Sequence, residues 1–390
     1  MRIHGLAVVP LRSVDVGRQV VGIRDAAGGQ AISHAMCRYA SRVVCSRNPP
    51  HGTPASVTTS TPHDALIRGI FSSPENASGQ LRAVLPPKLA ERIDWDSLHL
   101  ESGHFVEQDL TAQYSDLLYS ATVEAHPVLL YLLYEHQSSG DGMMPLRSLR
   151  YMVAIWTRWL EDNKGAKAIP AIIPVVLSNA PDGWRWPVSM GELFAIPEDL
   201  RSALQPYLPE FRFVLDDLMG RTDAELMART ATALGILGML ALRHARDDEG
   251  LAPCLLEWAK LVTAVFSAEN GREALGKVVR YALLANQRTT IQDLESVLVP
   301  MLGEAAREVV MTEGERLIQQ GELRGLEKGK AEGEAKGRAA SVLAFLSARG
   351  MKVSEDQRKR IESCSDIPTL DRWIVRAATA PTIDEVLSDN

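Results

Sequence analysis

Two carboxylates and an amide stand where two strands are expected to begin and end. Asp116 begins the apolar run 116–123, Glu135 ends the run 128–135, and Gln137 follows two residues later. Residues two apart on a strand point to the same face, so Glu135 and Gln137 project together, and pairing of the strands brings Asp116 to the same end of the sheet. We interpret the carboxylates as a hard-oxygen site for Mg²⁺, which other divalent cations could also fill. Such an ion activates water and stabilises charge developing on a phosphate.

The elements around these residues alternate between helix and strand. Residues 61–64 (Thr-Pro-His-Asp) are typical of a helix start, and residues 168–177 predict a further buried strand. Between the second strand and this third one we expect a helix whose apolar stripe consists of Leu146, Leu149, Val153, Trp156 and Leu160. The order helix, strand, strand, helix, strand predicts a mixed α/β layer.

Several short runs carry a resemblance to a known family. They are residues 61–64, 85–94, 100–103, 105–106, 114–119, 135–139, 149–152 and 173–177. In order and spacing, across about 150 residues, they resemble the bacterial Rpn (recombination-promoting nuclease)/YhgA-like transposase family. That family belongs to the PD-(D/E)XK nuclease superfamily. The resemblance therefore implies a restriction-endonuclease-like α/β core, with a mixed sheet flanked by helices, that hydrolyses DNA phosphodiester bonds with a divalent metal.

The resemblance also assigns roles to individual residues. Asp116 takes the place of the aspartate of the PD element, and Glu135 that of the second acidic residue. Gln137 stands where the superfamily usually has lysine, and glutamine can orient a water but supplies no positive charge. Ser178-Asn179-Ala180 replaces a turn in which relatives often carry an aromatic residue and then a glycine. A metal-dependent DNA endonuclease linked to recombination or mobile elements is expected; the alternative is a catalytically weak DNA-binding or oligomeric assembly protein that retains the fold.

Two further polar residues are accessory candidates at the site. His63 and Asp64 are features of the family, and in the superfamily the first helix often contributes an acidic group to the metal site. Asp64 is also the third residue of an expected helix, where an acid stabilises the helix start without any catalytic role. Both interpretations stay open, and for His63 packing or hydrogen bonding is the alternative to metal binding.

Three arginines on the helix after Gln137 are candidates for DNA binding. Arg147, Arg150 and Arg158 fall within an arc of about 80° if that helix is regular. We expect them to contact phosphates, which fixes position without reading sequence. The alternative is a solvated face whose aliphatic stems cover the edge of the core.

The composition excludes some classes of protein. The formal net charge is −7, so binding of DNA requires a local basic face or a bound cation. The four cysteines are scattered and support neither a zinc site nor a disulfide framework, which suits a reducing cytoplasm. No apolar run is long enough to span a bilayer, and no signal peptide is visible. A cytoplasmic protein without a membrane partner is expected.

Four regions are expected along the chain. They are a disordered basic extension (1–58), the nuclease-like domain (59–220), an all-helical region (221–312) and a charged tail with a small helical module (313–390). In the tail, glycines recur every fourth residue at Gly321, Gly325, Gly329, Gly333 and Gly337. On a helix these glycines form a stripe that a second backbone can approach, which favours a homo-oligomer. A flexible charged linker is the alternative.

Overall fold

The computed structural model describes residues 61–101, 117–124, 126–135, 141–285 and 288–388, and of residues 132–135 the backbone alone. By their contacts residues 57–390 form one unit. The basic extension expected at residues 1–58 lies outside the described residues.

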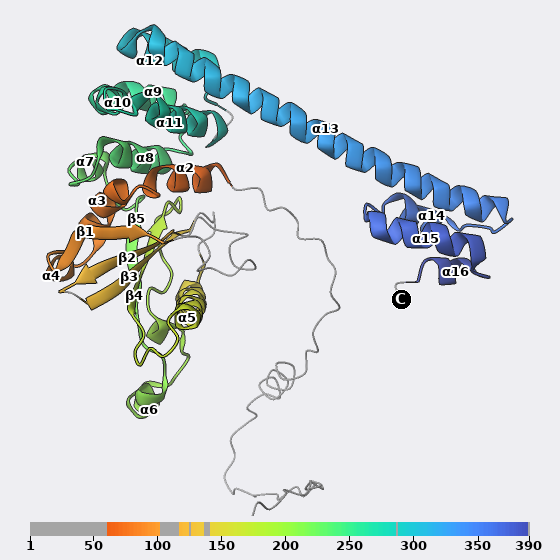
Figure 1. The fold of residues 1–390 in the computed structure, drawn as a ribbon, viewed down its shortest axis with the longest axis horizontal. Coiled ribbons are helices and arrows are strands. Elements are labelled where there is room, and N and C mark those ends of the chain that lie inside the picture. The colour runs from red at the N-terminus through yellow and green to blue at the C-terminus, as the bar shows by residue number, and fades with distance from the viewer. Residues whose placement is uncertain (1–60, 102–116, 125, 136–140, 286–287, 389–390) are drawn as a thin grey trace, which may run out of the picture. The chain divides into compact units, whose positions relative to one another are not determined.

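A five-stranded mixed sheet forms the centre of the first half of this unit (Figure 1). The strands, in the spatial order β1-β2-β3-β4-β5, are Ile93–Leu100, Leu117–Val123, His126–Glu135, Ala171–Ser178 and Val214–Asp217. The first three strands are antiparallel neighbours, whereas β3, β4 and β5 run parallel to one another. Parallel neighbours require a crossover connection, and α5 (Met144–Asp162) supplies it between β3 and β4.

The strands predicted around residues 116–123, 128–135 and 168–177 are confirmed as β2, β3 and β4, with small shifts of their ends. β1 and β5 were not predicted. The residues of β1 alternate only partly between apolar and polar, and β5 has only four residues, so neither gives a strong period-two pattern.

Both faces of the sheet are covered by side chains from helices. On one face, α2 (Pro62–Phe71), α3 (Pro74–Val84) and α8 (Ala233–Arg243) pack on residues such as Leu117 and Leu130. On the opposite face, α5 packs on residues such as Leu118 and Tyr131 (Figure 1). The sheet is therefore an inner layer between two helical layers.

The apolar stripe predicted for α5 is wrong. The helix buries Met144, Ser148, Tyr151, Met152 and Ile155. Three members of the predicted stripe, Leu146, Val153 and Leu160, are instead 39%, 50% and 43% exposed. Heptad spacing suits a coiled-coil seam, but a helix on a sheet presents a broader face with the 3.6-residue period.

The helices after the sheet extend the first core. Before β1 lies α4 (Pro87–Ala90), and between β4 and β5 lie η2 (Met190–Leu193), α6 (Glu198–Leu204) and η3 (Gln205–Tyr207). After the sheet come α7 (Asp223–Met227) and α8. They are followed by α9, α10, α11 and α12 at Ala252–Glu257, Ala259–Phe266, Gly271–Ala285 and Ile291–Leu302. Buried residues of α8 to α12 and of the start of α13 (Glu304–Ala348) join the same core as α2 and α3. The regions expected at 59–220 and 221–312 thus share one hydrophobic core.

The tail is a 45-residue helix followed by three short ones. The end of α13 packs with α14 (Glu355–Glu362), α15 (Ile367–Thr379) and α16 (Ile383–Val386) around a separate small core that includes Val342. Residues 318–334 of α13, between the two cores, are all exposed.

A buried ion pair connects the sheet to the helical region. Both guanidinium Nη atoms of Arg229 donate to Asp216 of β5, at 2.8 and 2.7 Å, and Gln80 of α3 donates to the same carboxylate at 3.3 Å. The side chains of Arg229 and Asp216 are 8% and 0% exposed. A bidentate pair out of contact with water holds its partners in one geometry.

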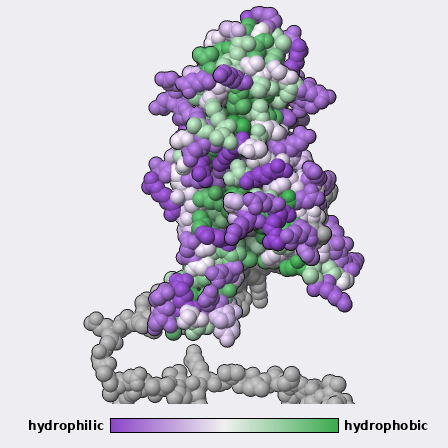
Figure 2. Space-filling view, turned by 90° about the vertical axis from the view of Figure 1, so that its left-hand side faces the viewer, coloured by the Kyte–Doolittle hydropathy of each residue, from purple (hydrophilic) through white to green (hydrophobic). Residues whose placement is uncertain are grey.

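Among the described residues, no helix has the length and apolar character needed to cross a bilayer. On the face of the molecule in Figure 2, hydrophilic side chains are interspersed with smaller hydrophobic areas. This mixture is usual at a water-exposed surface.

The close approach of α3 to the segment before α8 predicts a steric effect at Gly79. A Cβ there would lie 2.6 Å from Ala231 Cα and 3.0 Å from the Thr230 carbonyl oxygen, and neither backbone atom can rotate away. We expect Gly79→Ala to lower the free energy of unfolding by about 1–3 kcal/mol. Gly69→Ala, inside α2, is the control, because a Cβ there meets only the Lys277 side chain, at an ordinary contact distance of 3.6 Å, and should stabilise by up to about 1 kcal/mol. Equal thermal midpoints for Gly79→Ala and the unaltered protein would contradict the packing described.

The Asp216–Arg229 pair predicts a large loss of stability when one partner is removed. Arg229→Met leaves a buried carboxylate without its counter-charge, which should cost about 3–5 kcal/mol. Arg221→Met is the matched control: its pair with Glu225 is 3.9 Å long with both side chains about half exposed, so it should cost less than about 1 kcal/mol. Urea denaturation of the two variants measures the difference, and similar midpoints would show that the buried pair is not required.

Candidate active site

The carboxyl ends of three parallel strands meet at one edge of the sheet. Glu135, the last residue of β3, pairs with Ser178 of β4, and Ser178 pairs with Asp217 of β5. β2 begins at this edge too, because it runs antiparallel to β3 and its first residue, Leu117, pairs with Leu132. In open α/β sheets, ligands bind outside the carboxyl ends of the parallel strands.

The predicted catalytic residues are only partly described. Asp116 and Gln137 lie outside the described residues, as does the side chain of Glu135. The described backbone brings Leu117, which directly follows Asp116 in the sequence, to the same edge as Glu135. The predicted roles of Asp116, Glu135 and Gln137 stay predictions.

The turn after β4 is held in place from the helical region. The Ser178 side chain is buried, and its Oγ accepts a hydrogen bond from the Ala180 N–H at 3.2 Å. The Asn179 side chain donates to the Leu242 carbonyl at 3.1 Å, and Arg246 donates to the Asn179 carbonyl at 2.6 Å. Serine and asparagine at this turn therefore have local structural functions, which the sequence comparison with the family did not suggest.

Asp217 is a carboxylate at this edge that the sequence analysis missed. Its Oδ2 accepts a hydrogen bond from the Trp184 N–H at 3.0 Å. Glycines surround it closely: a Cβ on Gly220 would lie 3.0 Å from Oδ2, and one on Gly183, whose φ is +73°, 3.2 Å. Its Oδ1 is buried and has no hydrogen-bond partner among the described residues. An acidic pair directly after the apolar residues Val214 and Leu215 was the available signal.

The two accessory candidates have structural partners. Thr61 and Asp64 form a complete capping box, in which each side chain accepts a hydrogen bond from the other residue's N–H, at 3.2 and 3.0 Å. His63 is buried, and its Nδ1 lies 2.7 Å from the Tyr281 hydroxyl. Burial raises the pKa of Tyr281, so its hydroxyl keeps its proton for this hydrogen bond. Asp64 thus stabilises the start of α2, and His63 connects α2 to Tyr281 of α11.

The three arginines of α5 differ in their surroundings. Arg147 is half-buried and lies 3.0 Å from the Asp141 carboxylate. Arg158 pairs with Glu161 at 3.2 Å and Asp162 at 3.4 Å. Arg150 is exposed. A phosphate would have to compete with these carboxylates for Arg147 and Arg158, so Arg150 is the best placed of the three for the predicted contact with DNA.

Comparison with known proteins identifies a family. The family model described as "Putative transposase, YhgA-like" matches residues 61–273, which include the whole sheet and the helices up to the start of α11. No solved structure matches this chain significantly.

Three relatives from Escherichia coli are similar over most of their length. Recombination-promoting nuclease RpnD of strain O157:H7 is 31% identical, over 67% of this chain and 95% of its own. Recombination-promoting nuclease RpnC of strain K12 is 31% identical, over 58% of this chain and 71% of its own. The inactive recombination-promoting nuclease-like protein RpnE of strain K12 is 28% identical, over 70% of this chain and 87% of its own. With the family model and these relatives in agreement, the chain belongs to the Rpn/YhgA-like family.

Proposed function

We propose that this chain is a divalent-metal-dependent DNA endonuclease with a PD-(D/E)XK-type core, acting in DNA recombination or on mobile elements. Relatives named as recombination-promoting nucleases support nuclease activity. The mixed sheet between helical layers is the fold class that the family resemblance implies.

One observation carries the proposal. Leu117 of β2 pairs with Leu132 of β3. In the sequence, Asp116 directly precedes Leu117, and Glu135 follows Leu132 by three residues. Continuation of this pairing by one residue would bring the carboxylates of Asp116 and Glu135 close enough to share one ion. Because side chains alternate along a strand, we expect Asp116 on the same face of the sheet as Leu118, and Glu135 on the same face as Tyr131. Leu118 and Tyr131 both lie on the face that α5 covers.

The available donors fit Mg²⁺, which prefers oxygen ligands and few protein groups. Asp116 and Glu135 would hold the ion. Asp217 adds a carboxylate at the same edge, and its buried Oδ1 has no partner among the described residues. When bound, the ion supplies an activated water and offsets charge on the phosphate. Gln137 would orient that water without adding charge.

The second candidate is a catalytically weak DNA-binding or assembly protein that retains the nuclease fold. The similarity to RpnE, which is named inactive, favours it. The neutral Gln137 in place of lysine is compatible with this function. The two candidates differ in whether DNA is cut, and the following experiment separates them.

Removing either acidic residue should abolish nicking of supercoiled plasmid. We expect Asp116→Ala and Glu135→Ala each to lower the rate by about 10²–10³-fold, the effect of losing one stabiliser of a charged transition state. The unaltered protein should nick the plasmid in the presence of Mg²⁺, and nicking should stop when a chelator removes the Mg²⁺.

Asp199→Ala, at an exposed position of α6, is the control and should nick at the unaltered rate. Circular dichroism checks that each variant is folded. Nicking by Asp116→Ala at the unaltered rate would exclude this site, whereas DNA binding without nicking by the unaltered protein would support the second candidate.

We also propose that the exposed middle of α13 pairs with the same segment of a second copy. The tail is helical through the glycine repeat, where an added Cβ at Gly321, Gly325, Gly329, Gly333 or Gly337 meets nothing within 4 Å. Ile318, Leu323 and Leu326 are 59%, 55% and 72% exposed on the same segment. A second helix can approach closely at glycines and cover these apolar side chains.

Bulky residues at the glycines should reduce this self-association. Gly325→Gln with Gly329→Gln raises helix propensity but blocks close approach, so we expect the mass measured by light scattering to fall towards that of one chain. Lys330→Gln, on the same exposed segment, is the control and should leave the mass unchanged. A single-chain mass for the unaltered protein at high concentration would exclude the pairing.

A further inference from the structure

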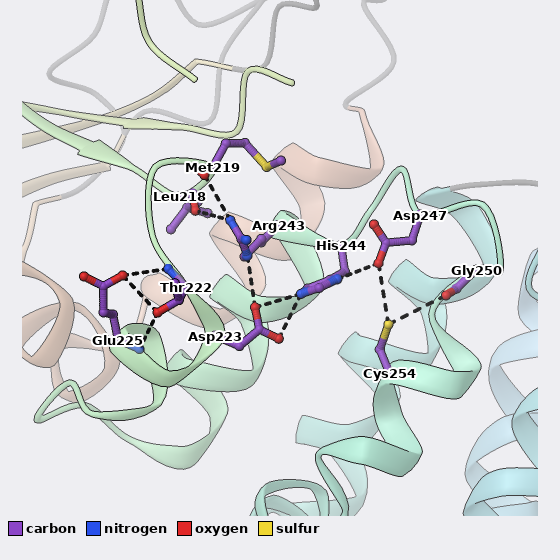
Figure 3. Close-up of polar contacts among 10 residues, drawn as sticks. All are labelled: Leu218, Met219, Thr222, Asp223, Glu225, Arg243, His244, Asp247, Gly250 and Cys254. Carbon is purple, nitrogen blue, oxygen red and sulfur yellow. Dashed lines mark hydrogen bonds and ion pairs between the residues drawn. The ribbon is translucent and has the colours of Figure 1, made fainter. Parts of the chain in front are cut away.

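A cluster of histidine, aspartate and cysteine side chains lies in the helical region (Figure 3). His244 is the C-cap of α8, Asp247 lies in the loop that follows, and Cys254 is on α9. One donor atom from each of the three lies within 4.8 Å of the others. The residues are separated by only a few positions in the chain, so one loop brings them together.

The donor atoms have nearly the spacing of a metal site. His244 Nδ1 lies 2.5 Å from Asp247 Oδ2, and Cys254 Sγ lies 3.8 Å from the same oxygen. In a tetrahedral zinc site with ordinary bond lengths, donor atoms are about 3.3–3.6 Å apart. A shift of the Asp247 carboxylate by less than about 1 Å therefore makes room for an ion among the three.

The other nitrogen of the imidazole has the partner that a metal ligand usually has. His244 Nε2 lies 2.9 Å from both carboxylate oxygens of Asp223, at the start of α7. Arg243 donates to Asp223 at 3.0 Å and holds that carboxylate in place (Figure 3). A carboxylate on the second nitrogen fixes the tautomer and directs the first nitrogen, here Nδ1, towards an ion.

The surroundings favour positive charge and admit water. The carboxylates of Asp223 and Asp247 both face the His244 ring, at 2.9 and 2.5 Å, and their negative charge favours a cation at this place. The side chains of His244 and Asp247 are 22% and 44% exposed, so an ion and a completing water can enter from solvent.

We propose that His244 Nδ1, the Asp247 carboxylate and the Cys254 thiolate bind a divalent transition-metal ion, with zinc as the best fit, and that Asp223 orients the histidine. Nitrogen, oxygen and sulfur donors together suit zinc and not magnesium. A water completes four-coordination. Binding displaces the protons of His244 Nδ1 and the Cys254 thiol into solvent.

The ion would brace a loop that contacts the nuclease-like sheet. Residues 244–251 join α8 to α9 and contain Arg246, which donates to the carbonyl of Asn179 in the turn after β4. A metal bound at both ends of this loop fixes Arg246, and through it the turn beside Ser178. The proposed role is structural, and it goes beyond the nuclease function.

Cobalt provides a test that does not depend on nuclease activity. Co²⁺ replaces zinc, and a cysteine thiolate bound to it gives a charge-transfer absorption in the near ultraviolet that magnesium sites of oxygen ligands lack. We expect metal-free full-length protein to develop this absorption on titration with Co²⁺ and to lose it when Zn²⁺ is added. Absence of the absorption in the unaltered protein would overturn the proposal, whatever the variants do.

The same cobalt titration of substituted proteins then identifies which residues bind the ion. Cys254→Ser should abolish the absorption, whereas Cys364→Ser, a matched change of the half-buried cysteine near α14, should retain it. Asp223→Asn should retain it but weaken Co²⁺ binding by about 10–100-fold, because it removes a partner of the ligand and not the ligand itself. Far-ultraviolet circular dichroism checks that each variant is folded. Persistence of the absorption in Cys254→Ser would overturn the assignment, since another cysteine would then be the ligand.

Discussion

Burial of the sheet on both faces is the constraint on which the rest of the structure depends. A sheet with three parallel strands has apolar side chains on both surfaces, so it needs a helical layer on each. Helix α5 covers one surface, and α2, α3 and α8 cover the other. Because α8 comes from beyond residue 220, the strands and the later helices form one hydrophobic core. Asp216 and Arg229 add a directed contact to this apolar attachment.

The same attachment controls the edge where the candidate site lies. In the turn that follows Ser178, the Asn179 side chain donates to the Leu242 carbonyl, and the Asn179 carbonyl accepts a hydrogen bond from Arg246. Ser178 in turn pairs with Glu135, the proposed metal ligand of β3. Changes in α8 or in the loop after it can therefore alter the site without touching a catalytic group, because rigid packing transmits displacements over short distances.

The two proposed metal sites differ in the chemistry of their donors. The sheet edge offers carboxylates and a buried oxygen of Asp217, a set suited to a hard ion that keeps its waters. The loop at His244 offers nitrogen and sulfur together with oxygen. Mg²⁺ should therefore not occupy the site at His244, since thiolate and imidazole donors suit softer ions.

The sequence by itself determined the elements whose signals are local. The helix start at Thr61 and the strands β2 to β4 were predictable, because caps and apolar runs depend on neighbouring residues. Asp116 and Glu135 also came from the sequence, through strand ends and family resemblance. Only the tertiary structure decided which face of α5 is buried, that four residues at Val214–Asp217 form a strand, and that His244 meets Asp223. These features depend on partners distant in the chain, and no local pattern records which surfaces will meet.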